Sequence, residues 1–247
     1  MEIAILNFCE NEWSIAEDDS PGANPMDIID NTNQIREAKA SHDKVIVIVH
    51  GGHEYYNLPS PRMQKQYRFY ADQGADIVVG HHTHCISGNE VYKGVPIYYS
   101  LGNFLFTKKN SNDEWYIGLI LEVDITSDGT ECQVHPIRQE KESFNLSLLE
   151  GEEKKEVFER INSYCSIIAH EKMLDVKWNE YIDHQSRMYL NYWSPISYVK
   201  NRYLNAAFRK LIGKMLNKKR TSLYLNLFRC EAHRDISEEV LKKFIRE

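Results

Sequence analysis

The sequence predicts an α/β fold with α+β elements: a mixed sheet with flanking helices, followed by a helical C-terminal appendage. Short runs rich in Val and Ile alternate with helical segments in the first half, an order typical of a parallel sheet covered by helices. Strands then follow one another without helices between them, which adds antiparallel strands. From about residue 149 the chain becomes helical.

The first strand and the first helix are predicted near the start of the chain. Residues 2–8 form an apolar run that is typical of a strand. Asn24-Pro25 then begins a helix that runs to about Ala40, because Asn is a favoured N-cap and Pro fits the first helical position. The residues of this helix predicted to face the core are Ile28, Ile29, Thr32, Ile35 and Ala38.

Two buried strands and a second helix follow. The strands are predicted at residues 45–49 and 76–79, where the β-branched side chains are typical of a parallel sheet. Between them, Ser60-Pro61 begins a helix that Gly74 ends. The resulting β-α-β-α-β order predicts parallel strands covered by helices.

The next part of the chain is predicted to contain strands alone. Residues 95–99 suit a short edge strand, and residues 115–125 alternate between apolar and polar side chains. Ser127-Asp128-Gly129 is a favourable hairpin turn, and a return strand is predicted from Thr130 to about Ile137. These strands favour a mixed sheet over a doubly wound fold.

Helical periodicity marks the C-terminal region. Amphipathic helices are predicted over residues 152–170 and 198–216, after a polar stretch at residues 138–142. We therefore expect two domains, residues 1–145 and 146–247.

Composition and cysteine usage predict a cytoplasmic protein. The first residues lack the basic start of a signal peptide, and no apolar run reaches the roughly 20 residues of a membrane helix. The five cysteines are scattered without a Cys-x-x-Cys pair, which favours a reducing compartment over a disulfide framework.

Charge is distributed unevenly along the chain. The net charge of −6 hides a basic end, because residues 195–247 carry 13 Lys and Arg against 5 Asp and Glu. The acidic first part argues against a nucleic-acid partner. Basic amphipathic helices bind anionic surfaces, so residues 198–220 are expected either to make peripheral contact with the inner membrane face or an anionic polymer, or to pack on the sheet.

Two histidine motifs follow directly on predicted strands. His50-Gly51-Gly52-His53-Glu54 follows the strand at 45–49, and Gly80-His81-His82-Thr83-His84 follows the strand at 76–79. In open α/β sheets, ligands bind beyond the carboxyl ends of the strands. The pattern predicts a metal or phosphate site, and the alternative is that some of these histidines are hydrogen-bonded structural residues.

Residue type alone does not choose the metal, because imidazole suits manganese, zinc and iron. The order of His50, His53 and Glu54 differs from the helical His-Glu-x-x-His motif of zinc proteases. Gly51-Gly52 would also disrupt a helix at this position. These features argue against a zinc-protease site.

Three motifs in order give the chain a resemblance to a known family. His50 to Glu54, Gly80 to His84 and Tyr99 to Phe104 resemble the motifs of the bacterial capsule-synthesis, or poly-γ-glutamate-synthesis, CapA family of the calcineurin-like metallophosphoesterase superfamily. Gly51 stands where the family's His-Trp-Gly-x-Glu motif has Trp. The resemblance covers about residues 1–140 and implies that residues 1–145 are the C-terminal part of a CapA-like domain.

The resemblance also implies a divalent metal, either manganese, zinc or iron. His50, His82 and His84 match histidine ligands of the superfamily's two-metal centre. The other motifs of that centre, Asp-x-His and Asn-His, occur nowhere in this chain. We therefore expect one ion rather than two, in a chain that is either a fragment or a reduced member of the family.

Four further residues receive roles from the resemblance. His81 and Glu54 match groups that either support the metal ligands from behind or face the substrate, and we assign them as the catalytic candidates. His53 and Asn103 are the candidates for substrate contact. For Asn103, a structural role in a backbone turn is an equal alternative.

Two functions are consistent with these features. The first is a metal-dependent phosphoesterase-type hydrolase or transferase of cell-surface polymer synthesis. The second is a non-catalytic accessory protein that binds polymer, glycan or metal, because the other metal-ligand motifs are absent. In both cases the expected partner is an anionic cell-surface polymer or a lipid-linked precursor.

Overall fold

The computed structural model describes residues 1–11, 15–16, 20–126, 129–192, 201, 203–204, 218–230, 233, 236–237 and 241. The chain divides into two compact units, Met1–Trp178 and Asn179–Glu247. All seven residues predicted for the site lie in the first unit.

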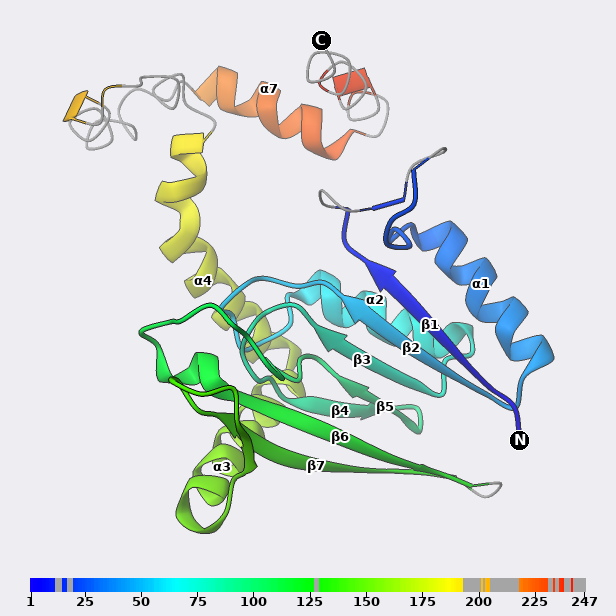
Figure 1. The fold of residues 1–247 in the computed structure, drawn as a ribbon. Helices are drawn as coiled ribbons and strands as arrows, with labels where there is room; N and C mark the ends of the chain where they lie inside the picture. Colours follow the sequence, from blue (N-terminus) through cyan, green and yellow to red (C-terminus); the bar gives the residue numbers. More distant parts are fainter. Residues whose placement is uncertain are drawn as a thin grey trace. The chain divides into compact units, whose positions relative to one another are not determined.

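A five-stranded sheet forms the centre of the first unit (Figure 1). Three parallel strands, β1 (Ile3–Cys9), β2 (Lys44–His50) and β3 (Ile77–His81), lie side by side in chain order. β5 (Val95–Tyr98) pairs with β3 in parallel, and β4 (Asn89–Tyr92) pairs with β5 in antiparallel orientation. The predicted α/β class and mixed sheet are confirmed.

The edge of the sheet differs from the prediction. The strand order is β1-β2-β3-β5-β4, so the segment predicted as a short edge strand, now β5, lies inside the sheet. The edge position belongs to β4, which sequence analysis did not predict. β4 and β5 form a tight hairpin around Lys93 and Gly94, both with positive φ, and β4 is only four residues long.

Two helices, α1 (Ile28–Ser41) and α2 (Pro61–Gln73), pack their buried residues in the main core with those of the sheet. The predicted bounds of α2 are confirmed: the Ser60 hydroxyl accepts a hydrogen bond from the Met63 N–H at 3.2 Å, and Gly74 ends the helix at a φ of 123°. A positive φ there suits glycine, which has no Cβ to clash. The start of α2 is therefore fixed by its cap.

The predicted start of α1 at Asn24 was wrong. The Asn24 carbonyl accepts from the Cys9 N–H at 2.8 Å, and the Met26 N–H donates to the Cys9 carbonyl at 2.7 Å. These bonds keep the segment extended beside the end of β1. The N-cap is instead Asp27, whose carboxylate accepts from the Ile29 N–H at 2.8 Å.

The predicted core face of α1 was correct only in part. Ile35 and Ala38 are buried, but Ile28 and Ile29 lie in the exposed first turn. Asn31 takes the third buried position of the stripe. Its side-chain oxygen accepts a hydrogen bond from the hydroxyl of Tyr70 on α2 at 2.9 Å, which satisfies a polar group inside the core.

A second sheet covers part of the opposite face. After a short 3-10 turn, Asp113–Tyr116, the strands β6 (Ile117–Ile125), β7 (Thr130–Gln139) and β8 (Leu146–Leu148) pair in antiparallel order. The predicted pairing of β6 with β7 is confirmed, although β6 begins at Ile117 and not at residue 115. Residues 127–128 of the predicted turn lie outside the described residues. The strands form a separate sheet rather than an extension of the first one. Residues from the two sheets share one cluster: Ile77, Val79, Tyr98, Leu121, Val123, Cys132 and Val134.

The C-terminal region of the chain contains the helices α3 (Gly151–Ile168), α4 (Glu171–Tyr192) and α7 (Lys218–Arg229). α3 confirms the helix predicted over 152–170 and belongs to the first compact unit. Most of the helix predicted at 198–216 lies outside the described residues. The division into domains at 145 and 146 stays a prediction. Within the described parts of the chain, no helix combines the length and apolar composition needed to cross a membrane.

Replacing Ser60 by Ala should lower the free energy of unfolding by about 1 kcal/mol, because α2 then loses its N-cap acceptor. Urea denaturation followed by circular dichroism measures this change. Ser41→Ala is the control, since Ser41 is exposed at the end of α1 and should change stability by less than about 0.5 kcal/mol. Equal losses in both variants would contradict the capping role.

Candidate functional site

Two histidines end neighbouring strands at the same edge of the sheet. His50 is the last residue of β2, His81 is the last residue of β3, and the two are register partners. Their Nδ1 atoms lie 3.1 Å apart. The two sequence motifs therefore meet, as their positions after parallel strands predicted.

His82 joins the same group from the other side of His50. Its Nδ1 lies 2.9 Å from the Nε2 of His50, so that His81, His50 and His82 form a linked row, here called the histidine chain. A neutral imidazole has one N–H donor and one acceptor nitrogen. Three neutral rings can therefore satisfy both contacts, with His50 donating through one nitrogen and accepting through the other.

Within the histidine chain, burial favours the neutral form of His81. The pKa of His81 is lowered to about 4, first by desolvation and then by the proximity of His50 and His82. His81 is therefore uncharged near neutral pH. Its ring offers a lone pair to a proton or a cation instead of a positive charge to an anion.

His84 lies in a second polar group next to the histidine chain. Its Nδ1 is 2.8 Å from Oδ1 of Asn103, and the Asn103 Nδ2 donates to the Trp115 carbonyl at 2.9 Å. The Nε2 of His84 is 4.0 Å from a carboxylate oxygen of Glu54. Asn103 thus holds the ring of His84 at Nδ1, while the Nε2 of His84 faces Glu54.

The backbone at the second motif is unusual. His82 and His84 have φ values of 105° and 58°, in the region that non-glycine residues rarely adopt. The ring centroids of His82 and His84 are 6.0 Å apart, and the ring of His84 packs 4.8 Å from Trp115. The motif therefore directs His82 and His84 to different neighbours.

A metal ion fits only part of this arrangement. The nitrogens of His50 and His82, 2.9 Å apart, match two adjacent ligands with metal–nitrogen bonds of roughly 2.0–2.1 Å. Among the described residues, however, no group of three His, Cys, Asp or Glu could hold a metal ion. His50 also presents opposite nitrogens to His81 and His82, which makes a row and not a cage. The ligand role of His84 stays a prediction.

His53 packs against an aromatic ring. Its ring centroid is 4.8 Å from that of Trp178. Burial lowers the pKa of His53, and the nearby Glu10 carboxylate opposes that shift. Its role in substrate contact stays a prediction.

Two residues at this edge were missed by sequence analysis. Glu10 follows β1 directly, and its carboxylate accepts from the Gly52 N–H at 3.1 Å and from the Arg62 guanidinium at 3.0 Å. The rule that selected His50 and His81 applies equally to the residue after β1. A closer use of that rule would have found Glu10, whereas nothing in the sequence near Arg62 singles it out.

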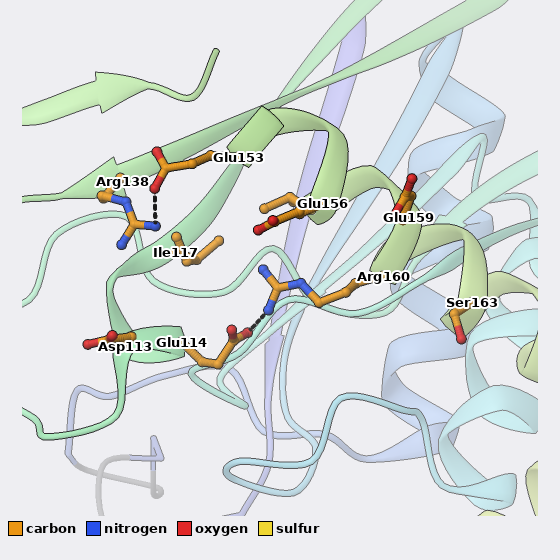
Figure 2. Close-up of a pocket in the computed structure, with 10 residues that line it drawn as sticks. Asp113, Glu114, Ile117, Arg138, Glu153, Glu156, Glu159, Arg160 and Ser163 are labelled. Carbon is orange, nitrogen blue, oxygen red and sulfur yellow. Dashed lines mark hydrogen bonds and ion pairs between the residues drawn. The ribbon is translucent and has the colours of Figure 1, made fainter. Parts of the chain in front are cut away.

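A cavity of about 570 Å³ lies elsewhere in the first unit, between the start of β6 and α3 (Figure 2). Ion pairs join Arg138 to Glu153 and Arg160 to Glu114 across it. None of the predicted site residues lines it. We interpret it as a gap between α3 and the second sheet that these two ion pairs bridge.

Comparison with known proteins agrees with this fold and motif pattern. Residues 2–108 match the model of the family described as bacterial capsule synthesis protein PGA_cap. PGA biosynthesis protein CapA of Bacillus subtilis is 43% identical over 106 residues, which cover 42% of this chain and 28% of the relative. Capsule biosynthesis protein CapA of Bacillus anthracis is 41% identical over 112 residues, which cover 43% and 27%.

The fold and the linked histidines define an α/β protein with a polar site at the carboxyl edge of its parallel strands. Over residues 2–108, the chain is similar to the bacterial capsule-synthesis CapA family, as its motifs predicted. The match spans less than a third of the length of each of these two relatives.

Replacing His81 by Gln should reduce the acid sensitivity of the fold. The pKa of His81 is about 4 in the folded chain and 6.5 ordinarily, so the unfolded chain binds more protons between these values and acid favours unfolding there. From pH 6.5 to 4 the natural chain should lose about 2 kcal/mol more stability than the variant, allowing for partial exposure of the ring.

Urea denaturation at a series of pH values measures this difference. His135→Gln is the matched control, because His135 lies on β7 and bonds to Glu122. Parallel pH profiles for the natural chain and His81→Gln would contradict the assignment.

Proposed function

We propose that this chain takes part in the synthesis of a poly-γ-glutamate-type cell-surface polymer, and that its histidine chain binds a divalent metal ion for phosphoester chemistry. The observation that carries the proposal is the pair of close nitrogens on His50 and His82, at the carboxyl edge of the parallel strands. The name of the Bacillus subtilis relative supports the polymer class, and that of the Bacillus anthracis relative supports a capsule.

The donor set suits a cation. Metal binding needs neutral imidazoles, and the contacts among His81, His50 and His82 are ones that three neutral rings can make. A bound divalent ion would lower the pKa of a water molecule and stabilise charge on a phosphoryl group. We assign His50 and His82 as ligands, with His84 as a candidate third ligand if its ring turns from Asn103.

The roles of the surrounding groups are assigned from their contacts. His81 is in contact with His50 and uncharged, but its lowered pKa makes it a weak proton acceptor, so we assign it to orient the His50 ring. Glu54 faces the Nε2 of His84 and would orient that ring or receive its proton. Asn103 holds the opposite side of the same ring, which supports a positioning role.

A second candidate function is a non-catalytic accessory role. It is favoured by the absence of a three-ligand metal group among the described residues. In this case the chain would bind the anionic polymer or a lipid-linked precursor without turnover. The basic segment 198–220 would support either role by contact with an anionic membrane at its cytoplasmic face.

Metal binding tests the main proposal directly. Equilibrium dialysis against Mn²⁺ or Zn²⁺ should show one ion per chain, and His50→Ala or His82→Ala should each weaken binding at least tenfold, as loss of a direct ligand requires. His135→Ala, which removes a histidine on the second sheet, should bind like the natural chain. Equal binding by all three variants would refute the histidine site.

Activity distinguishes the two candidate functions. With Mn²⁺ and a chromogenic phosphodiester, we expect turnover well below the typical range of about 1–10³ s⁻¹, because the described ligand set is incomplete. Residual turnover that His82→Ala removes supports the metal-dependent enzyme. Metal-independent binding of poly-γ-glutamate without any turnover supports the accessory role.

A further inference from the structure

The Glu10 carboxylate is held at both oxygens by donors from different elements. Its Oε2 accepts from the Gly52 N–H at 3.1 Å, and its Oε1 accepts from the Arg62 guanidinium at 3.0 Å. Gly52 lies in the loop after β2, and Arg62 lies in the first turn of α2. One donor for each oxygen is an arrangement that recognises a carboxylate.

The glycines of the first histidine motif allow this close approach. A Cβ at Gly51 would lie 2.7 Å from the Glu10 side chain, and one at Gly52 would lie 2.8 Å from Thr83. Gly52 also has a φ of +126°, which side-chain-bearing residues rarely adopt. The loop therefore presents the Gly52 N–H at a place that only glycine leaves open.

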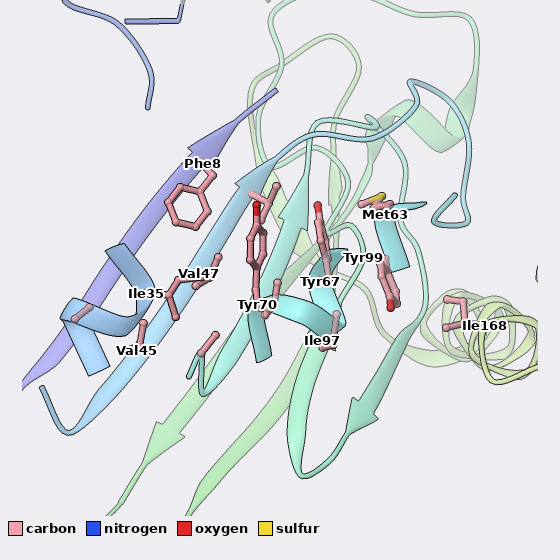
Figure 3. Close-up of a cluster of buried hydrophobic side chains, with 14 of the residues drawn as sticks. Phe8, Ile35, Val45, Val47, Met63, Tyr67, Tyr70, Ile97, Tyr99 and Ile168 are labelled. Carbon is pink, nitrogen blue, oxygen red and sulfur yellow. The ribbon is translucent and has the colours of Figure 1, made fainter. Parts of the chain in front are cut away.

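A buried hydroxyl points toward the same edge. Tyr67 is 1% exposed, and its hydroxyl makes no hydrogen bond within the described residues. The hydroxyls of its neighbours Tyr70 and Tyr99 are both bonded, to Asn31 and Glu90. In Figure 3 the hydroxyl end of Tyr67 points toward the carboxyl ends of β2 and β3, whereas that of Tyr99 points the other way.

The position of the Tyr67 hydroxyl links it to Glu10 and Arg62. A Cβ at Gly80 would lie 3.0 Å from this hydroxyl, which places it against the end of β3. Burial raises the pKa of Tyr67, the Glu10 carboxylate raises it further, and Arg62 opposes the shift. The Tyr67 phenol is therefore protonated, has an unused O–H donor, and is close enough to Glu10 and Arg62 to interact with their charges.

We propose that the Gly52 N–H, the Arg62 guanidinium and the Tyr67 hydroxyl form a carboxylate subsite. In the free chain Glu10 occupies the first two donors, and a carboxylate of a glutamyl polymer displaces Glu10 and also accepts from the Tyr67 hydroxyl. This inference rests on the proposed function and names the group of the polymer that is recognised. The subsite lies two residues from His50, so a bound carboxylate would place the adjoining part of the polymer beside the histidine chain.

Displacement of Glu10 is energetically feasible. The side chains of Arg62 and Glu10 are 60% and 28% exposed, and ion pairs with that much solvent contact contribute little to stability. Glu10 can therefore turn into solvent without disturbing the core. An occupant from the chain itself also shows that the donors accept a glutamate carboxylate.

The test measures binding of a short γ-linked glutamate oligomer by calorimetry, with a γ-linked glutamine oligomer as the uncharged control. Glu10→Gln removes the competing charge and should bind the glutamate oligomer roughly tenfold more tightly than the natural chain. Arg62→Gln should bind it roughly tenfold more weakly, as loss of a charged hydrogen bond predicts. Glu122→Gln, on the second sheet, should behave like the natural chain.

Tyr67→Phe separates ligand binding from folding. It removes only the hydroxyl, which makes no hydrogen bond in the described structure, so the midpoint of urea unfolding should stay the same or rise. Oligomer affinity should nevertheless fall several-fold. Circular dichroism of each variant confirms that the fold is retained.

Three results would overturn the subsite. In the first, the Glu10→Gln protein binds the glutamate oligomer no more tightly than the natural chain does. In the second, the Arg62→Gln protein binds it as tightly as the natural chain does. In the third, the natural chain binds the glutamine oligomer as tightly as the glutamate oligomer. Metal retention by the Glu10→Gln and Arg62→Gln proteins is measured in parallel. It decides the proposed function separately, because His50 and His82 would bind the ion whether or not the carboxylate subsite exists.

Discussion

The parallel pairing of β1, β2 and β3 is the constraint on which the rest of this structure depends. The register places Cys9 beside His50 and His50 beside His81, so that three strands end together. Val45, Val47 and Val49 are fully buried in the core shared with the helices, and this burial fixes the register. A slip of one residue would turn these side chains to the opposite face and separate the two histidine motifs.

Layering on both faces of the sheet determines the electrostatics of its edge. The helices cover one face and the second sheet covers part of the other, and the His81 ring at the end of β3 is partly buried. A charge is costly in such surroundings, and the lowered pKa of His81 is the consequence. The same environment strengthens the hydrogen bonds of neutral imidazoles and makes the row of three rings a stable arrangement.

Features carried by contiguous residues could be predicted from the sequence. The cap of α2 at Ser60 and its end at Gly74 depend on neighbouring residues and were predicted correctly. The strands before the histidine motifs were also predicted, although they run on to His50 and His81, one and two residues beyond the predicted ends. Features set by distant contacts were missed. α1 starts late because residues 24–26 bond to Cys9, and the carboxylate of Glu10 meets Arg62, which is 52 residues further along the chain. Such pairings become visible only when the sheet brings the segments together.

Strand alternation explains why two kinds of polar group occur side by side at this edge. Val49 and Gly80 face α2 and its surroundings, so the next residues, His50 and His81, face the other way. Gly51 returns to the helix side, where a Cβ on it would meet the side chain of Glu10. Lone-pair donors for a cation therefore gather on one side of the strand ends, and N–H and O–H donors for an anion gather on the other. A polymer with carboxylates along its length and a cation bound near them could contact both sides at once. Recognition of the polymer and chemistry on the polymer would then use different atoms of the protein.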